Sequence, residues 1–289
     1  MDIKQISFVG GDMRIIHLIE LFSKENYQIK IFGFDKYDFK LNNVTKCTTL
    51  VEAITDAQIV IGPLPFSSNG ASINAPFNSS PILISDLVEL LNSNQVLIAG
   101  RLDTELNTMF AENNIKAIDI LSREEFAVLN AISTAEGAIQ IAMENSQCTL
   151  HNTPVLVLGF GRIGKILCKM LDGLGADVYC EARKFSDIAW IKAYGYKPIH
   201  LNDIDKHLEK FNIFINTIPY VVFDKERIDR MNKNSLFIDL ASKPGGIDIE
   251  SGKEKDINII LALSLPGKVA PLTAATHIKE TVGNIFEEI

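Results

Sequence analysis

A glycine-rich turn is the clearest sign of chemistry in the sequence. It reads Gly159-Phe160-Gly161-Arg162-Ile163-Gly164, follows an apolar run at 155–158 and opens a helical stretch at 163–174. In this spacing the first glycine permits a tight turn, the second admits a pyrophosphate and the third lets the helix pack on the strand. The amides and dipole of a helix N-terminus favour the anion. The motif predicts a dinucleotide site; a tight turn without a ligand is the alternative.

The residues after the next strand indicate which dinucleotide. The apolar run at 178–180 continues as Glu181-Ala182-Arg183-Lys184. NAD sites place an acid about 20 residues after the glycines to accept the ribose hydroxyls. We place the strand tip at Ala182, so Glu181 should point to the opposite face, because strand side chains alternate. Arg183 and Lys184 would meet a 2′-phosphate. The sequence favours NADP, although two solvated surface cations are the alternative.

Two more turns follow strands that we expect in the same sheet. Asn216-Thr217-Ile218-Pro219 follows the run at 212–215, and Ala241-Ser242-Lys243-Pro244-Gly245-Gly246 follows the run at 235–240. Ligands of doubly wound sheets bind beyond the carboxyl ends of the strands. We therefore expect the first turn, together with Ala241, Ser242 and Gly245, to contact the cofactor. Ordinary loop chemistry, which also favours proline and glycine, is the alternative.

Alternating strand and helix patterns must position these turns. A first series of apolar runs is typical of strands at 5–9, 28–32, 58–61, 95–99 and 116–120. A second series lies at 155–158, 178–180, 198–200, 212–216, 235–240 and 258–263. This pattern predicts an α/β chain with two Rossmann-like, doubly wound parallel-sheet domains.

The domain boundaries follow from the long helical stretches. We expect a substrate domain of flavodoxin or Rossmann type at 1–125, a connecting helix at 126–150 and an NADP-binding domain at 151–272. By analogy with other two-domain folds, the closing helix at 273–289 should return to the first domain.

Composition narrows the function classes. The chain has 289 residues, of which 47% are hydrophobic, and this hydrophobic share excludes intrinsic disorder. Its formal net charge of −8 counts against a general nucleic-acid binder. We expect no membrane span, because no apolar run approaches about 18 residues. The start lacks the pattern of a secretory signal, and the four cysteines form no C-x-x-C pair. These features favour a cytoplasmic protein with free thiols and no metal site.

Seven segments carry a resemblance to a known family. They are SFVGGDMR at 7–14, STAEGAI at 133–139, LGFGRIGK at 158–165, EAR at 181–183, NTIP at 216–219, DLASKPGG at 239–246 and LPGKVAPLTAA at 265–275. The second half resembles the cofactor domain of D-2-hydroxyacid dehydrogenases. The whole chain more closely resembles the A-subunit family of the dipicolinate synthases.

The resemblance implies a function. It implies two domains around an active cleft, in a cytosolic enzyme of the mother cell of a sporulating bacterium. The reaction would be NADP-dependent oxidation of a dihydrodipicolinate-type intermediate of the lysine pathway to pyridine-2,6-dicarboxylate. It also implies a flavoprotein-like B-subunit as partner, and the sequence leaves a homo-oligomer open.

Two other functions remain. D-2-hydroxyacid dehydrogenases use an arginine and a histidine–glutamate pair, but here the corresponding loops read Ser242-Lys243-Pro244-Gly245 and Pro266-Gly267. His277 reads as a helix residue. The departure argues against simple alcohol oxidation. Because no histidine–carboxylate pair is evident, an NADP-binding regulatory or scaffold protein without its own catalysis is the other alternative.

A dicarboxylate substrate would need cations and hydroxyl groups near the cofactor. We assign catalytic roles to Lys268, Lys243 and Glu136, and substrate binding to Arg14, Ser67, Ser133, Thr134 and Arg101. Arg14, Lys243 and Lys268 should lie close together, since an acidic chain needs a focused basic cleft for a dianion. Each cation could instead be a surface charge.

The stretch around Glu136 is a polar stripe on the connecting helix. Asn130, Ser133, Thr134 and Gly137 recur at i, i+3, i+4 and i+7, so they share one helix face. Glu136 lies off this face. We expect it to act as a general base if burial raises its pKa, and to be structural or solvent-facing otherwise.

Overall fold

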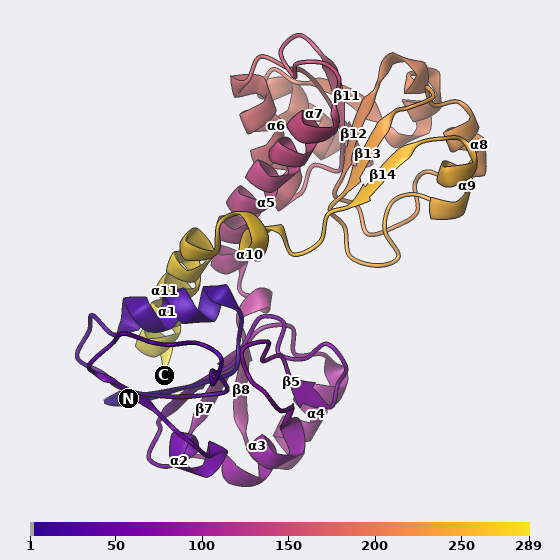
Figure 1. Cartoon of the computed structure of the whole chain (residues 1–289). Helices are drawn as coiled ribbons and strands as arrows, with labels where there is room; N and C mark the ends of the chain where they lie inside the picture. Colours follow the sequence, from indigo (N-terminus) through magenta and orange to yellow (C-terminus); the bar gives the residue numbers. More distant parts are fainter. Residues whose placement is uncertain (1–2) are drawn as a thin grey trace. The chain divides into compact units, whose positions relative to one another are not determined.

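The computed structural model describes residues 3–289, which form two compact units (Figure 1). The first unit comprises the described residues up to Leu129 together with Ala270–Ile289, and the second comprises Asn130–Val269. Each is built on a six-stranded parallel sheet with flanking helices. Helix α5 (Glu124–Asn145) begins in the first unit and continues into the second. The predicted fold class is confirmed.

The sheet of the first unit has the strand order β3-β2-β1-β4-β7-β8. Its strands are β1 (Gln5–Val9), β2 (Gln28–Phe32), β3 (Val44–Lys46), β4 (Ile59–Ile61), β7 (Val96–Ala99) and β8 (Lys116–Asp119). Its helices are α1 (Met13–Phe22), α2 (Leu50–Ile54), α3 (Ile84–Leu90), α4 (Thr104–Glu112), the 3-10 turn η1 (Ile120–Ser122) and α11 (Pro271–Glu288). A separate antiparallel hairpin pairs β5 (Ser72–Ile73) with β6 (Ile82–Leu83). β3, β5 and β6 were not predicted, because they are short and carry no long apolar run.

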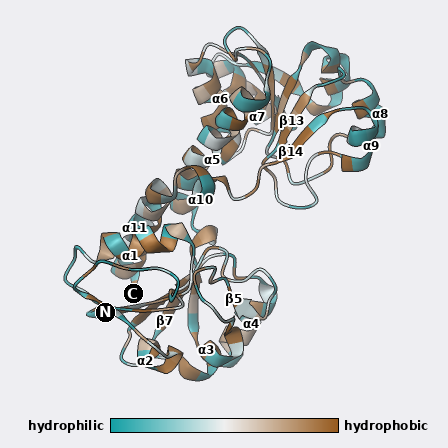
Figure 2. Ribbon diagram, viewed as in Figure 1, coloured by the Kyte–Doolittle hydropathy of each residue, from teal (hydrophilic) through white to brown (hydrophobic). Residues whose placement is uncertain are grey.

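Apolar residues cover both faces of this sheet, as parallel strands require. One face packs against α1, α11 and the start of α5, and the other against α2, α3 and α4. Figure 2 shows hydrophobic residues concentrated along the strands. The burial of alternate residues on opposite faces explains why the strands read as continuous apolar runs.

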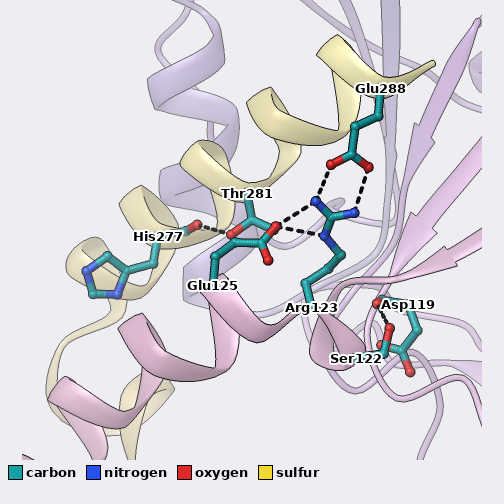
Figure 3. Close-up of polar contacts among 7 residues, drawn as sticks. All are labelled: Asp119, Ser122, Arg123, Glu125, His277, Thr281 and Glu288. Atoms are coloured by element: carbon teal, nitrogen blue, oxygen red, sulfur yellow. Dashed lines mark hydrogen bonds and ion pairs between the residues drawn. The ribbon is translucent and has the colours of Figure 1, made fainter.

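The closing helix α11 packs within the first unit, which confirms its expected return. The ring of Phe286 lies 6.2 Å from that of Phe22 of α1. At its end, Glu288 accepts hydrogen bonds from the Arg123 guanidinium at 2.5 and 2.7 Å, and Glu125 accepts one at 2.7 Å (Figure 3). The hydrogen bond from Arg123 lowers the pKa of Glu288. This ion pair ties the end of α11 to the start of α5.

The second unit has the strand order β11-β10-β9-β12-β13-β14. Its strands are β9 (Pro154–Leu158), β10 (Asp177–Ala182), β11 (Lys197–His200), β12 (Ile213–Asn216), β13 (Leu236–Asp239) and β14 (Asn258–Leu261). One face packs against α5, α6 (Arg162–Gly173), α7 (Phe185–Ala193) and α10 (Leu265–Val269). The other face packs against the 3-10 turns η2 (Leu201–Lys206) and η3 (Leu208–Lys210) and the short helices α8 (Lys225–Asp229) and α9 (Ile249–Glu254). All six predicted strands of this unit are present.

Among residues 3–289, α5 is long and apolar enough to cross a membrane by length and composition alone. Four of its alanines, however, are fully buried: Ala131, Ala135, Ala138 and Ala142. Core helices of folded domains pass the same test. The packing of α5 accounts for its apolar composition.

Candidate functional site

The candidate site lies at the carboxyl edge of the sheet in the second unit. Strand β9 stands between β10 and β12, so the chain order reverses beside it. Such a switch point is where open α/β sheets bind ligands. The glycine turn follows β9, and the turn Asn216–Pro219 follows its neighbour β12. The topology therefore brings the two predicted cofactor turns together.

A side chain at each of the three glycines of the turn would meet different surroundings. Gly159 has φ +91°, and a Cβ there would lie 2.6 Å from Oγ1 of Thr217. A Cβ on Gly164 would lie only 2.0 Å from the carbonyl oxygen of Gly159. A Cβ on Gly161, in contrast, would meet nothing within 4 Å. Packing explains Gly159 and Gly164, whereas Gly161 leaves open space that fits an approaching pyrophosphate.

The start of α6 offers amide donors to that space. Gly161 is the N-cap residue and has no side chain with which to cap the helix. The first amides of an α-helix lack intrahelical acceptors. The turn itself is anchored by Phe160, whose buried ring lies 5.6 Å from Nζ of Lys165 and 6.2 Å from the ring of Tyr194. The residues present thus fit a dinucleotide pyrophosphate.

The tip of β10 has the alternation that the sequence predicts. Ala182 belongs to the same apolar cluster as Val178 and Cys180, whereas Tyr179 belongs to the cluster on the other face. Glu181 therefore points away from Ala182, and it is 1% exposed. Burial raises the pKa of Glu181.

The two basic residues that follow this tip are solvent-exposed. Arg183 and Lys184 come directly after β10 and precede α7. The backbone carbonyl of Arg183 lies 3.1 Å from Nε2 of His200, which fixes the chain at this point. Both cationic side chains are thus available to an anion at the carboxyl edge.

A buried polar network joins the turns that follow β12 and β13. The side-chain amide of Asn216 donates to Oδ1 of Asp239 at 2.8 Å and to the carbonyl of Ile218 at 2.9 Å. Its Oδ1 accepts from the amide of Ile218 at 3.1 Å. Asn216 was predicted to contact the cofactor, but its polar atoms are engaged inside the protein. Its role in this structure is to hold the turn.

Asp239 completes that network, and the sequence analysis did not assign it a role. Its carboxylate accepts from the amides of Gly246 at 2.7 Å and Ala241 at 3.1 Å. A Cβ on Gly246 would lie 2.1 Å from Nδ2 of Asn216, and one on Gly245 would lie 2.7 Å from Asp239. The glycines of this turn thus permit close packing on the network. An acid ending a buried apolar strand was the signal that could have found Asp239.

The remaining predicted residues of these turns differ in exposure. The hydroxyl of Thr217 donates to the carbonyl of Leu158 at 2.8 Å, which joins the two cofactor turns. Ile218 is half-buried and Pro219 is exposed. Ser242 and Lys243 are exposed in the turn after β13.

The polar stripe on α5 packs against α10. A Cβ on Gly137 would lie 3.1 Å from Leu265, so this glycine permits close helix packing. The hydroxyl of Thr134 donates to the carbonyl of Asn130 at 2.9 Å. Ser133 is buried, and its hydroxyl has no hydrogen-bond partner in the described structure. An unpaired buried hydroxyl is costly, so packing accounts for Gly137 of this stripe but not for Ser133.

The structure places Glu136 at the surface. Its side chain is exposed, which is the solvent-facing arrangement that the sequence left open beside the role of a base. It lies off the packed stripe, where α5 faces solvent. Lys268 of α10 is exposed as well.

Three predicted residues belong to the first unit, at the carboxyl ends of its strands. The Arg14 guanidinium pairs with Asp12 at 2.7 Å and also donates to the carbonyl of Leu64, so the loops after β1 and β4 meet there. The hydroxyl of Ser67 donates to the carbonyl of Ser72 at 2.7 Å and is used within its own loop.

Arg101 is the third of these residues. It is exposed at φ +61°, and its amide donates to Asp119 at 3.0 Å. The expected proximity of Arg14, Lys243 and Lys268 involves both units and stays a prediction.

Comparison with known proteins identifies the family. Residues 5–121 match the N-terminal domain of the dipicolinate synthase A-subunit. Residues 127–244 match the NAD-binding domain of the D-isomer-specific 2-hydroxyacid dehydrogenases. The dipicolinate synthase A-subunit of Bacillus subtilis (strain 168) is 30% identical over 288 residues, which cover 99% of this chain and 96% of that protein. The chain belongs to the dipicolinate synthase A-subunit family.

Solved structures agree with this assignment. The dipicolinate synthase A-subunit from Bacillus halodurans has 29% identity and a TM-score of 0.90, over 98% of this chain and 97% of that chain. Its counterpart from Bacillus subtilis has 28% identity and a TM-score of 0.91, over 100% and 97%. An L-alanine dehydrogenase, at 13% identity and a TM-score of 0.65 over 98% and 88%, shares the fold alone.

The family and the site together give the broad chemistry. The predicted resemblance to the dipicolinate synthase A-subunit is confirmed. The second unit has a dehydrogenase-type dinucleotide-binding domain, so its cofactor is a nicotinamide dinucleotide and its chemistry is that of an oxidoreductase. Membership of an A-subunit family implies that the synthase has a partner subunit.

Proposed function

We propose that this chain is the dehydrogenase component of a dipicolinate synthase. It oxidises a dihydrodipicolinate-type intermediate of the lysine pathway to pyridine-2,6-dicarboxylate, with NADP, in the cytoplasm of the mother cell of a sporulating bacterium. The single observation that carries the proposal is the glycine turn: Gly161 faces open space while Gly159 and Gly164 are fixed by packing. In a chain of this family, that geometry supports a bound dinucleotide.

NADP is the proposed form of the cofactor. Ala182 occupies the strand tip where NAD sites carry an acid. Glu181 is turned to the other face and buried, and the exposed Arg183 and Lys184 follow. Two cations beside the tip suit the extra phosphate of NADP.

The substrate needs little activation, because the loss of a hydride and a proton makes its ring aromatic. When bound, the nicotinamide supplies the hydride acceptor. The chain must hold the two carboxylates and orient the ring, and such positioning can supply about 7–11 kcal/mol of the barrier. We assign the carboxylates to Lys243 and Lys268, with the hydroxyls of Ser133 and Thr134 beside them. Lys268 and Lys243 are the proposed catalytic cations beside the reacting ring, and the carboxylate of Glu136 is the proposed acceptor of the ring proton.

The first unit supplies the remaining substrate contacts in this proposal. Arg14, Ser67 and Arg101 all follow its strands at the carboxyl edge. Arg14 already pairs with Asp12, so it would bind a carboxylate as part of that pair. The proposed partner is a flavoprotein-like B-subunit, and self-association of the chain is compatible with this assembly.

A regulatory NADP-binding protein is the second candidate. It is favoured by the exposure of all three proposed catalytic side chains, Lys243, Lys268 and Glu136. A simple 2-hydroxyacid dehydrogenase is not favoured, since Pro266-Gly267 lies in the first turn of α10 where that family carries histidine.

One experiment separates these functions. The purified chain is incubated with dihydrodipicolinate and NADP, with and without the B-subunit, while NADPH absorbance and dipicolinate are measured. We expect equal amounts of NADPH and dipicolinate. If the chain binds NADP but forms no NADPH in either mixture, the dehydrogenase proposal fails and the regulatory role stands.

A further inference from the structure

Helix α7 presents apolar side chains in both directions. Ile188 and Ile191 face the core of the second unit. The opposite side carries Phe185, Ala189, Trp190, Ala193 and Tyr194, all of them exposed. We call these five residues the α7 face. A helix that is apolar all round is normally buried on both sides, so this face lacks a covering surface in the part of the chain that the structure describes.

The α7 face is comparable in size to the largest apolar patches of monomeric proteins, which are often functional. Phe185 is 79% exposed, and Trp190 and Tyr194 are each 55% exposed. From the usual area of aromatic side chains, these three leave roughly 400 Å² of aromatic surface in water. That is about half of what one partner contributes to a standard protein interface.

The aromatic rings of this face are already ordered. Trp190 and Tyr194 stack with centroids 5.6 Å apart and an interplanar angle of 25°. Tyr194 also contacts the ring of Phe160 in the glycine turn, at 6.2 Å. Rigid aromatic side chains lose little conformational entropy on binding, so this arrangement is pre-organised for a partner. It also links the α7 face to the cofactor turn.

The charges around the α7 face distinguish two possible partners, a second copy of this chain and a different polypeptide. Lys184 and Lys192 border it, and Lys165 lies over Phe160. Asp187 is the acid on the same helix, and it is half-buried. Two copies of this face brought together would place cations against cations, which is unfavourable. A different polypeptide with an apolar centre and an acidic rim is complementary.

We infer that the α7 face is the docking surface for the second subunit of the synthase, which presents an apolar centre with an acidic rim. This inference rests on the two-subunit assembly of the proposed function. Docking on α7 places the second subunit beside the glycine turn, through the contact of Tyr194 with Phe160. Trp190 and Tyr194 are the anchors, since Trp and Tyr dominate binding energy at interfaces.

The test uses the full chain and the B-subunit from the same organism. The double variant Trp190→Ser/Tyr194→Ser is compared with wild type and with Val51→Ser, a control on α2 that changes an equally exposed side chain at 55%. Complex formation is measured by calorimetry and light scattering. Each chain is also tested for thermal stability, which should be unchanged because both aromatics are at the surface. NADPH binding is compared between wild type and the single variant Trp190→Ser, because Tyr194 contacts Phe160 of the glycine turn.

We expect the double variant to bind the B-subunit at least about 30-fold more weakly, and the control to bind as wild type does. Lys192→Glu, which leaves the aromatic face intact, should slow association and flatten its salt dependence. Normal binding by the double variant would overturn the inference, as would wild-type homodimers that the double variant abolishes. Should wild type bind NADPH but form no complex with the B-subunit, the two-subunit assembly itself would fail.

Discussion

The glycines of α6 allow one prediction to be worked out fully. Gly161, Gly164 and Gly173 lie on the same helix or at its cap, but they face different surroundings. A Cβ on Gly164 would lie 2.0 Å from the carbonyl oxygen of Gly159, whereas one on Gly161 or Gly173 would meet nothing within 4 Å. None of the three has a positive φ, so alanine can adopt the backbone angles of each, and the variants differ in what the added Cβ meets. The three alanine variants therefore separate packing, ligand access and helix propensity.

The expected changes in the free energy of unfolding differ in sign among the three variants. Gly164→Ala forces α6 away from the end of β9, and such overpacking costs about 1–3 kcal/mol. Gly173→Ala should stabilise the unit by about 0.5–1 kcal/mol, because alanine is the better helix former. Gly161→Ala should lower stability only modestly, because glycine is a better N-cap residue than alanine but the added Cβ meets no neighbour. It should weaken NADPH binding about 10-fold or more, since its Cβ fills the space proposed for the pyrophosphate.

Denaturant unfolding followed by tryptophan fluorescence provides the stability assay. Trp190 is the chain's one tryptophan and lies in the second unit, so its signal reports the unit that carries these glycines. NADPH binding is measured separately by titration. The reasoning would be refuted if Gly164→Ala were as stable as wild type, or if Gly161→Ala bound NADPH normally.

Three further predictions concern charged groups. Arg183→Ala should weaken NADP binding about 10-fold or more and NAD binding little, because only NADP has the 2′-phosphate; an equal loss in two parallel titrations would contradict this. Burial raises the pKa of Glu181. The contribution of this group to folding stability is therefore fully present below pH 4.5, its ordinary pKa, and is lost as the pH rises through its pKa in the folded protein. Glu181→Gln should thus be more stable than wild type at neutral pH and equal to it in acid, measured by tryptophan fluorescence. The lowered pKa of Glu288 acts in the opposite sense, contributing stability that is present above 4.5 and lost as pH falls. Arg123→Met should lower the melting temperature at neutral pH and have little effect in strong acid, which calorimetry can test.

The strands and the glycine turn could be predicted from the sequence because their signals are local. A strand buried on both faces reads as a continuous apolar run, and β9 is an example. β3 (Val44–Lys46) could not be found in this way, because this edge strand is largely exposed. The turn at Gly159–Gly164 was recognisable because its first and last glycines lie against each other, which fixes their spacing.

The contacts between turns could not be predicted, because they depend on residues far apart in the chain. Nothing near Asn216 in the sequence indicates that Asp239 occupies its amide. Glu136 shows a related difficulty, since its exposure depends on how α5 is rotated against α10. Helical spacing correctly placed Glu136 off the polar stripe, but spacing alone does not tell which side of a helix is covered.

The buried network explains how the two turns can act together. Asn216 ends β12, Asp239 ends β13, and the hydrogen bond between them lies in the core, where an unsatisfied partner would be costly. Asp239 also holds the backbone of the turn that carries Lys243. Neither turn can therefore shift without breaking a buried hydrogen bond with the other. The backbones of the two turns, which carry the proposed cofactor contacts and the proposed substrate cation, are thus fixed relative to each other, and such positioning is what hydride transfer between two bound rings requires.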